Sequence, residues 1–178
     1  MHMLHSREMK KGFTMIELLV VVSIMGILSA MGVASLRNAV INNRVKDAAI
    51  NVTAYLERVA SETNRLSEKV CVKASGSRIQ ATKGACGSTA GALISKYEFE
   101  GNENLSFVNS KGGADCAKSW ADGETFVPKF GLSAAPVEGC IVVKYGDGDR
   151  QARALKKKEK NNIIPQISYD GGTHWMGL

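Results

Sequence analysis

The N-terminal third of the chain has an apolar pattern that changes character along its length. Residues 13–34 form a nearly uninterrupted apolar run, after which apolar residues recur mostly at steps of three and four up to Leu66. That spacing is the period of an α-helix with one apolar face. The pattern predicts one helix of about 54 residues, roughly 80 Å long at 1.5 Å per residue. Two helices with a bend at Gly26 or Gly32 are the alternative.

The pattern changes again after Ser67. Short segments rich in alternating and β-branched residues are separated by clusters of glycine and serine, which is typical of strands joined by turns. The expected strands are residues 70–72, 78–82, 92–99, 105–108, 125–130, 139–145 and 163–169. We therefore predict an α+β fold, in which a small antiparallel sheet or barrel-like sandwich covers the C-terminal half of the long helix.

The apolar run at residues 13–34 is long enough to span a membrane. Arg7, Lys10 and Lys11 precede it, and basic residues are retained on the cytoplasmic side, so the rest of the chain is expected to be exported. The first alternative is a secretory signal peptide, but such a peptide has an apolar core shorter than this run, with a small-x-small cleavage site after it.

Glu17 lies inside the apolar run. A carboxylate in hydrocarbon costs about 3 kcal/mol by insertion scales and usually serves a function.

Residues 10–22, with the sequence KKGFTMIELLVVV, resemble the class III signal of type IV pilins and type II secretion pseudopilins. The resemblance implies that a membrane peptidase cuts after Gly12. It also implies that the same enzyme methylates Phe13, which becomes the N-terminal residue. The family has a glutamate at the fifth mature position, and Glu17 occupies that position here.

The spacing between the new N-terminus and Glu17 has a chemical interpretation. The amine of Phe13 on an incoming subunit would pair with the Glu17 carboxylate of a neighbour, so that neither charge is unpaired in an apolar filament core. We expect Glu17, with Thr14, to act in subunit assembly. Many pilins have proline at the position of Ala34, which this chain lacks, so whether the helix loosens on assembly is left open.

A second, looser resemblance concerns the β-rich part. Residues 126–133 and 139–143 are similar to the β-region of minor pilins or pseudopilins of the GspH/FimT type. The expected divisions of the chain are a cleaved leader at 1–12, a transmembrane or filament-core helix at 13–34, an amphipathic helix stalk at 35–66 and an exported head at 67–178.

Composition restricts the class further. The chain has 178 residues, of which 44% are hydrophobic and 22% are charged, as in a folded soluble protein. A mean hydropathy of -0.09 excludes a protein with many membrane spans. The length suits one domain, or a small domain with an appendage.

All four cysteines follow the apolar helix, and no CxxC pair occurs. His174 is the only histidine beyond the leader, so we expect no metal site and no cofactor. An even number of cysteines in an oxidising compartment favours disulfides. Three pairings are open, and we favour Cys71 with Cys86 and Cys116 with Cys140 because these close the shortest loops.

The net charge of +6 is unevenly distributed. Residues 1–12 carry three basic residues and one acidic residue, so cleavage lowers it to +4. Residues 150–160 contain one acidic and six basic residues, which are Arg150, Arg153, Lys156, Lys157, Lys158 and Lys160. If the segment were a strand, its even-numbered cations would point to one face and could bind the phosphates of a nucleic acid. These cations are Arg150, Lys156, Lys158 and Lys160. Some FimT-like minor pilins are implicated in DNA uptake, so nucleic acid is one candidate partner. A solvated hairpin that protects a sheet edge is the alternative.

We find no set of side chains placed as nucleophile, base and acid, and we therefore expect that the protein is not an enzyme.

The predicted function is structural: a minor pilin or pseudopilin of a type IV pilus or type II secretion pseudopilus. Its partners would be other pilins, the prepilin peptidase, the inner-membrane assembly platform and membrane lipid. It would cross the bacterial inner membrane once, with a periplasmic head. The alternatives are a DNA-binding minor pilin and a membrane-anchored adhesin, whose aromatic platform would need Trp120 or Trp175.

Overall fold

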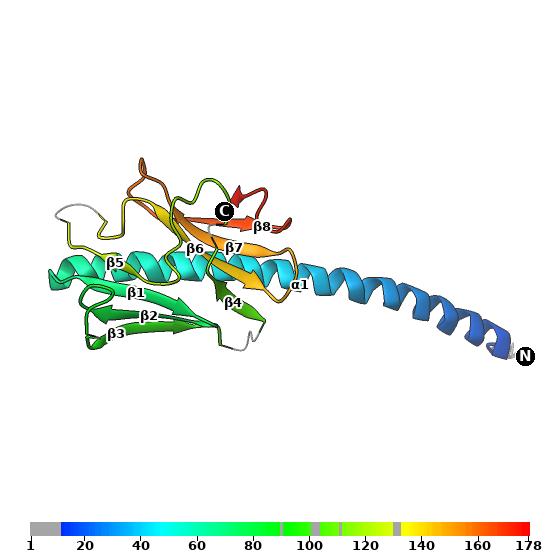
Figure 1. The fold of residues 1–178 in the computed structure, drawn as a ribbon. Coiled ribbons are helices and arrows are strands. Elements are labelled where there is room, and N and C mark those ends of the chain that lie inside the picture. Colours follow the sequence, from blue (N-terminus) through cyan, green and yellow to red (C-terminus); the bar gives the residue numbers. More distant parts are fainter. Residues whose placement is uncertain (1–11, 90, 101–103, 111, 130–132) are drawn as a thin grey trace, which may run out of the picture. The chain divides into compact units, whose positions relative to one another are not determined.

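The structure is a computed structural model that describes residues 12–89, 91–100, 104–110, 112–129 and 133–178. It contains one helix and nine strands within these residues (Figure 1). Their bounds are α1 Met15–Leu66, β1 Val70–Ser75, β2 Arg78–Lys83, β3 Leu93–Glu98, β4 Leu105–Val108, β5 Glu124–Phe126, β6 Gly139–Tyr145, β7 Gln151–Lys156, β8 Ile164–Ser168 and β9 Met176–Gly177. The chain divides into two compact units, Met1–Val40 and Ile41–Leu178, and each is described by itself. We call residues 67–178 the head, as above.

The helix α1 passes through Gly26 and Gly32 without losing its α-helical assignment, so the prediction of one helix is confirmed and that of two helices is wrong. The helix ends where Ser67 takes the left-handed conformation, with φ 53°. The Ser67 amide donates to the carbonyl of Asn64 at 3.2 Å, as is usual at a helix C-terminus.

The strands form two antiparallel sheets. Sheet A has the order β3-β2-β1-β5, and sheet B has the order β4-β6-β7-β8-β9. Alternate residues of both sheets face the second half of α1, because successive side chains of a strand point to opposite faces. This arrangement of a long helix and antiparallel sheets confirms the predicted α+β fold class.

Two strands and several boundaries differ from the sequence-based prediction, among them the end of β1, which lies at Ser75 and not at Val72. The central strand β7 and the short edge strand β9 were not predicted. Every residue of β7 from Ala152 to Lys156 is buried. Two of these residues, Arg153 and Lys156, are cations, so the sequence of β7 lacks the apolar pattern that indicates a buried strand. The strand β5 ends at Phe126, whereas the prediction extended to Phe130, which lies outside the described residues.

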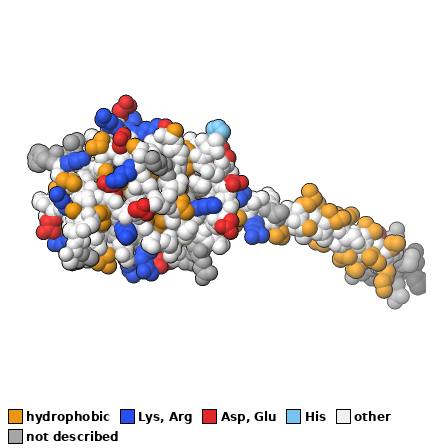
Figure 2. Space-filling model, in the orientation of Figure 1, with side chains coloured by type: hydrophobic (Ala, Val, Ile, Leu, Met, Phe, Trp, Pro, Cys, Tyr) orange, Lys and Arg blue, Asp and Glu red, His pale blue; other side chains and the backbone are white. Residues whose placement is uncertain are grey.

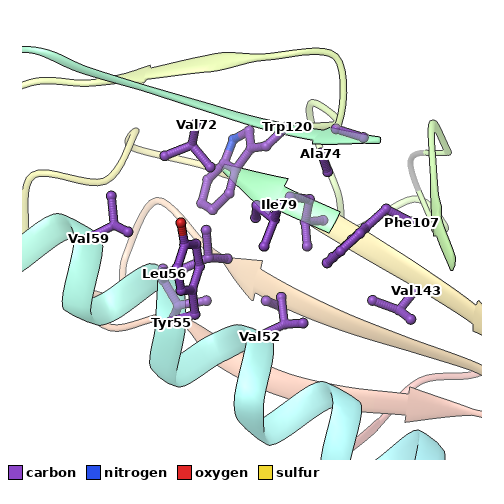
Figure 3. Close-up of a cluster of buried hydrophobic side chains, with 14 of the residues drawn as sticks. Val52, Tyr55, Leu56, Val59, Val72, Ala74, Ile79, Phe107, Trp120 and Val143 are labelled. Atoms are coloured by element: carbon purple, nitrogen blue, oxygen red, sulfur yellow. The ribbon is translucent and has the colours of Figure 1, made fainter. Parts of the chain in front are cut away.

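The core lies between α1 and the sheets (Figure 3). Leu56 and Trp120 are fully buried in it, together with Ile79 of β2 and Phe126 of β5. The predicted apolar stripe of the helix is buried from Val45 to Thr63, at Val45, Ala48, Val52, Leu56, Val59 and Thr63. The head and this part of the helix therefore share one core.

A smaller cluster covers the outer face of sheet B. It contains Cys116, Cys140, Val142 and Leu155. The structure has disulfides Cys116–Cys140 and Cys71–Cys86, the pairing that the shortest-loop argument favours. Their sequence separations of 24 and 15 residues give a chain-entropy contribution of about 3 kcal/mol each.

Reductant is expected to open Cys71–Cys86 before Cys116–Cys140. Both sulfurs of the second bridge belong to buried residues, at 2% and 0% exposure, whereas Cys71 and Cys86 are half-buried, and thiol exchange requires access to the sulfur. Timed alkylation and peptide mass spectrometry measure the order. Equal rates of alkylation at all four cysteines would contradict it.

Candidate functional site

The start of α1 is a capping box formed by Thr14 and Glu17. The Thr14 backbone N–H and the Thr14 hydroxyl each donate to Glu17 Oε2, both at 3.1 Å, and the Glu17 N–H donates to Thr14 Oγ1 at 3.3 Å. These reciprocal bonds satisfy N–H groups that have no partner within the helix. They fix the first helical residue at Met15 and leave Gly12 and Phe13 outside the helix.

The junction between Gly12 and Phe13 is therefore in exposed, non-helical backbone, with the Phe13 side chain 85% exposed. A β-carbon at Gly12 would meet no atom of this chain within 4 Å. Both features suit a bond that another protein must reach. Arg7, Lys10 and Lys11, the predicted basic residues of the leader, lie outside the described residues.

The surface of α1 around Glu17 is apolar. The helix contains a stretch of mean hydropathy 2.3, none of it buried, that is long enough to cross a membrane. Val33, Leu36 and Val40, which belong to the predicted apolar stripe, are still 67%, 66% and 41% exposed. Figure 2 shows hydrophobic side chains along most of this surface. Glu17 is the only charged residue between positions 12 and 36, so it has no cation of this segment as a partner.

The basic segment 150–160 does not form the single face that the sequence suggested. The strand β7 ends at Lys156, and Lys157 to Lys160 form a turn before β8. Lys158 and Lys160 therefore do not lie on one strand with Arg150 and Lys156, which was the condition for a single basic face.

Arg153 of β7 is buried, with 1% exposure. Its Nε donates to Gln166 Oε1 at 2.7 Å, its Nη1 donates to the Gly112 carbonyl, and its Nη2 lies 3.7 Å from Asp115 Oδ2. The guanidinium also lies 4.2 Å from the centre of the Trp175 ring, a favourable cation–π distance. Burial lowers the pKa of Arg153, and Asp115 opposes that shift. Arg153 is thus part of the packing of sheet B.

Lys156 and Arg150 are also bound within the molecule. Lys156 Nζ donates to the carbonyls of Lys160 and Asn161, both at 2.9 Å, and burial lowers the pKa of Lys156. Arg150 Nε donates to Asn42 Oδ1 at 2.7 Å. Four of the six cations of this segment therefore have a partner within the molecule, because the exposed Lys157 also lies 3.5 Å from Asp115 Oδ2. Lys158 and Lys160 are exposed as well.

Among the described residues, metal-binding groups, the cavity beside α1 and the tryptophan faces give no further candidate site. These residues hold no group of three or more side chains placed to bind a metal. A cavity of about 420 Å³ lies between α1 and the edge strand β3, and half of the residues that line it are charged. Trp120 is in the core and Trp175 is half-buried against Arg153, so neither indole forms the open platform that an adhesin would use.

Comparison with known proteins gives one match. The family model of the prokaryotic N-terminal methylation motif matches residues 7–33, which include Gly12, Phe13, the capping box and the apolar part of α1. No curated protein and no solved structure matches the chain. The motif and the exposed apolar helix indicate membrane anchoring and processing by a prepilin peptidase. The chain thus has the N-terminal segment of a type IV pilin-like protein.

Proposed function

We propose that the protein is a minor pilin or pseudopilin, a structural subunit of a type IV pilus or a type II secretion pseudopilus. The peptidase cuts after Gly12 and methylates Phe13. The observation that carries this proposal is the coincidence of the methylation motif with an exposed helix whose side chains are mostly apolar and whose one charged residue between positions 12 and 36 is Glu17. Such a helix needs membrane lipid or the helices of other subunits to cover it.

The location follows from the same segment. The protein is held in the bacterial inner membrane with its N-terminus in the cytoplasm and its head in the periplasm, and its partners are other pilins and the assembly platform. Two disulfides in the head suit that oxidising compartment. The GspH/FimT subtype is supported by residues 126–133 and 139–143, which include the end of β5 and most of β6; residues 130–132 lie outside the described residues.

Glu17 would pair with the free Phe13 amine of a neighbouring subunit. Both capping bonds from Thr14 go to Glu17 Oε2, which leaves Oε1 for an incoming amine. The pairing compensates two charges that would each be costly in the apolar filament core. The capping box also orients the carboxylate relative to the first turn of the helix.

The variants Glu17→Ala and Glu17→Gln test this role. Glutamine serves in a capping box as glutamate does, so Glu17→Gln keeps the cap and removes only the charge. We expect both variants to insert in the membrane and both to enter filaments at least about tenfold less than the wild type, since even 1.4 kcal/mol changes an equilibrium tenfold. The measurement is the ratio of protein in sheared filaments to protein in membranes.

Ser23→Ala is the matched control. Ser23 lies on the same exposed apolar helix, and its hydroxyl donates only to the Leu19 carbonyl one turn earlier, at 2.8 Å. Its replacement should leave incorporation unchanged. Normal incorporation of Glu17→Gln together with poor incorporation of Glu17→Ala would show that the cap, and not the charge, matters, and the pairing role would be wrong.

A further inference from the structure

Another cavity of the head lies at the outer face of sheet B. It has a volume of about 330 Å³ and is lined by residues 113–115, by Arg153 of β7 and by residues 173–175. These segments belong to the loop after β4, to a central strand and to the loop before β9. Binding sites for small molecules usually have volumes of about 300–1,000 Å³, so this cavity has room for a small ligand.

Arg153 lines this cavity with a guanidinium that three contacts hold in place. Its Nε donates to Gln166 and its Nη1 to the Gly112 carbonyl, while the Trp175 ring covers one face of the guanidinium at 4.2 Å. The side chain is 0% exposed. Fixing a flexible side chain and burying its charge are both unfavourable. Because folding has already done both here, a ligand would meet a preorganised donor.

The third nitrogen of this guanidinium lacks a hydrogen-bond acceptor. Nη2 carries two N–H groups, and it is buried without a hydrogen-bond partner among the described residues. Asp115 Oδ2, which belongs to a residue of the same cavity, lies 3.7 Å from it, whereas a charge-assisted hydrogen bond is about 2.7–2.9 Å long. A buried donor without an acceptor is unfavourable, so an acceptor placed in the cavity would be bound.

The charged groups at the cavity favour an anionic ligand. Asp115 lies between two cations, since its Oδ2 is also 3.5 Å from Lys157 Nζ, and both distances are long for a charge-assisted hydrogen bond. Asp170, the carboxylate that contacts the cavity residue His174, is already paired with that histidine at 2.5 Å. Arg153 and Lys157 therefore share the single carboxylate of Asp115 within the part of the chain that the structure describes.

We propose that this cavity binds a small organic acid, whose carboxylate accepts hydrogen bonds from Arg153 Nη2 and displaces the side chain of Asp115. Asp115 acts as an internal competitor, because it presents the same chemical group to the same donor. Its side chain is 57% exposed, so it can turn towards solvent when a ligand enters. The inference goes beyond the proposed function, since assembly into a filament does not require such a ligand.

A carboxylate suits this cavity better than a phosphate. A phosphate monoester carries a charge of about -1.5 to -2 at neutral pH and has three acceptor oxygens, so it is repelled more strongly by Asp115 and needs more donors. Nη2 offers two N–H groups, and Lys157 is 46% exposed, so solvent weakens its attraction. A water molecule that bridges Nη2 and Asp115 is the other candidate occupant. The experiment distinguishes all three.

Nuclear magnetic resonance of the full-length chain in uncharged detergent micelles tests the proposal, with acetate as the probe. The chain has two tryptophans, and each gives one indole N–H resonance, which the variant Trp175→Phe assigns. Trp175 lies against Arg153 at the cavity, whereas Trp120 is fully buried in the core. We expect acetate, exchanged for chloride at constant ionic strength, to shift the Trp175 resonance saturably and to leave the Trp120 resonance in place.

Asp115→Asn makes the test specific to this cavity. The variant keeps the size of the side chain and removes the competing charge, so the dissociation constant for acetate should fall roughly tenfold. The matched control is Asp147→Asn, which removes the same charge from an exposed position in the turn after β6 and should leave the constant unchanged. Both substituted residues are exposed, so both variants should fold, and an unmoved Trp120 resonance verifies this.

Three results would overturn the proposal. If acetate shifts the Trp175 resonance saturably in neither the wild type nor Asp115→Asn, the cavity holds water only. If the shift occurs but Asp115→Asn leaves the dissociation constant unchanged, acetate binds outside the cavity. If phosphate saturates the shift in a parallel titration and acetate does not, the cavity is a phosphate site. Processing and filament assembly are measured separately, so each of these results leaves the proposed function standing.

Discussion

The Gly12→Val variant is expected to accumulate in the membrane as the uncut chain, with a complete loss of the mature form. Gly12 lies in exposed backbone next to Phe13 and outside the helix, and a branched side chain there would obstruct a peptidase that must close around the Gly12–Phe13 bond. A β-carbon at Gly12 meets nothing within 4 Å in this chain, so the substitution should not disturb the protein itself. Immunoblotting of membrane fractions measures the ratio of uncut to mature protein.

The loss of cleavage has a second consequence. Without a new N-terminus at Phe13 there is no amine to pair with Glu17, so Gly12→Val should fail to enter filaments even though its Glu17 is intact. Mass spectrometry of the wild type should find the N-terminus at Phe13, heavier by one methyl group.

Gly26→Val is the matched control, because a β-carbon at Gly26 on the same helix also meets nothing within 4 Å. This variant should be processed normally. Mature protein in the Gly12→Val strain would refute the assignment of the cleavage site. Loss of processing in both variants would mean that valine acts through the membrane helix and not at the scissile bond.

The Gly139→Ala variant is expected to lose most of the stability of the head. Gly139 begins β6 with φ +139°, and a β-carbon there would lie 2.1 Å from Nε1 of Trp120 and 2.8 Å from the Lys118 carbonyl. Trp120 is fully buried and its backbone N–H donates to the Cys140 carbonyl at 2.8 Å, so the ring cannot move aside cheaply. Overpacking and backbone strain together predict a loss of about 3–5 kcal/mol.

That loss is a large share of the 5–15 kcal/mol by which folded domains are usually stable. It corresponds to a fall in melting temperature of roughly 10–15 °C for a protein of this size. The fluorescence of the buried indole of Trp120, followed during thermal or urea unfolding of the full-length chain, measures it.

Two other glycines separate the causes of this loss. Gly146 has φ +54° and open space around its β-carbon position, so Gly146→Ala tests backbone strain alone and should cost about 1 kcal/mol. Gly177 has no positive φ, and its β-carbon position is also open, so Gly177→Ala should be close to neutral. If Gly139→Ala cost no more than Gly146→Ala, the close packing of Trp120 on β6 would be wrong.

The helix could be predicted from the sequence because its signals are local. The apolar run, the spacing of apolar residues to Leu66 and the absence of proline all act over one or a few turns. The start at Met15 also has a local cause, since Thr14 and Glu17 have the spacing of a capping box. The leader motif is similarly short, and a family model matches the chain there at residues 7–33.

The basic segment shows why the rest could not be predicted. Arg153 and Lys156 look solvated in the sequence, yet both are buried. The partners of Arg153 are distant in the sequence: the Gly112 carbonyl, Gln166 and Trp175. The partners of Lys156 are two carbonyls across the following turn. Burying a cation is unfavourable unless such partners are present, and no local pattern reveals them.

The sequence by itself determined the long helix, its apolar half with Glu17, the cleavable N-terminal segment and the α+β class, because each depends on residue order over short distances. The tertiary structure alone decided that β7 is a central strand and which cations stay exposed. These depend on strand pairing and on carbonyl groups brought together from distant parts of the chain, and they exist only once the two sheets have packed on α1.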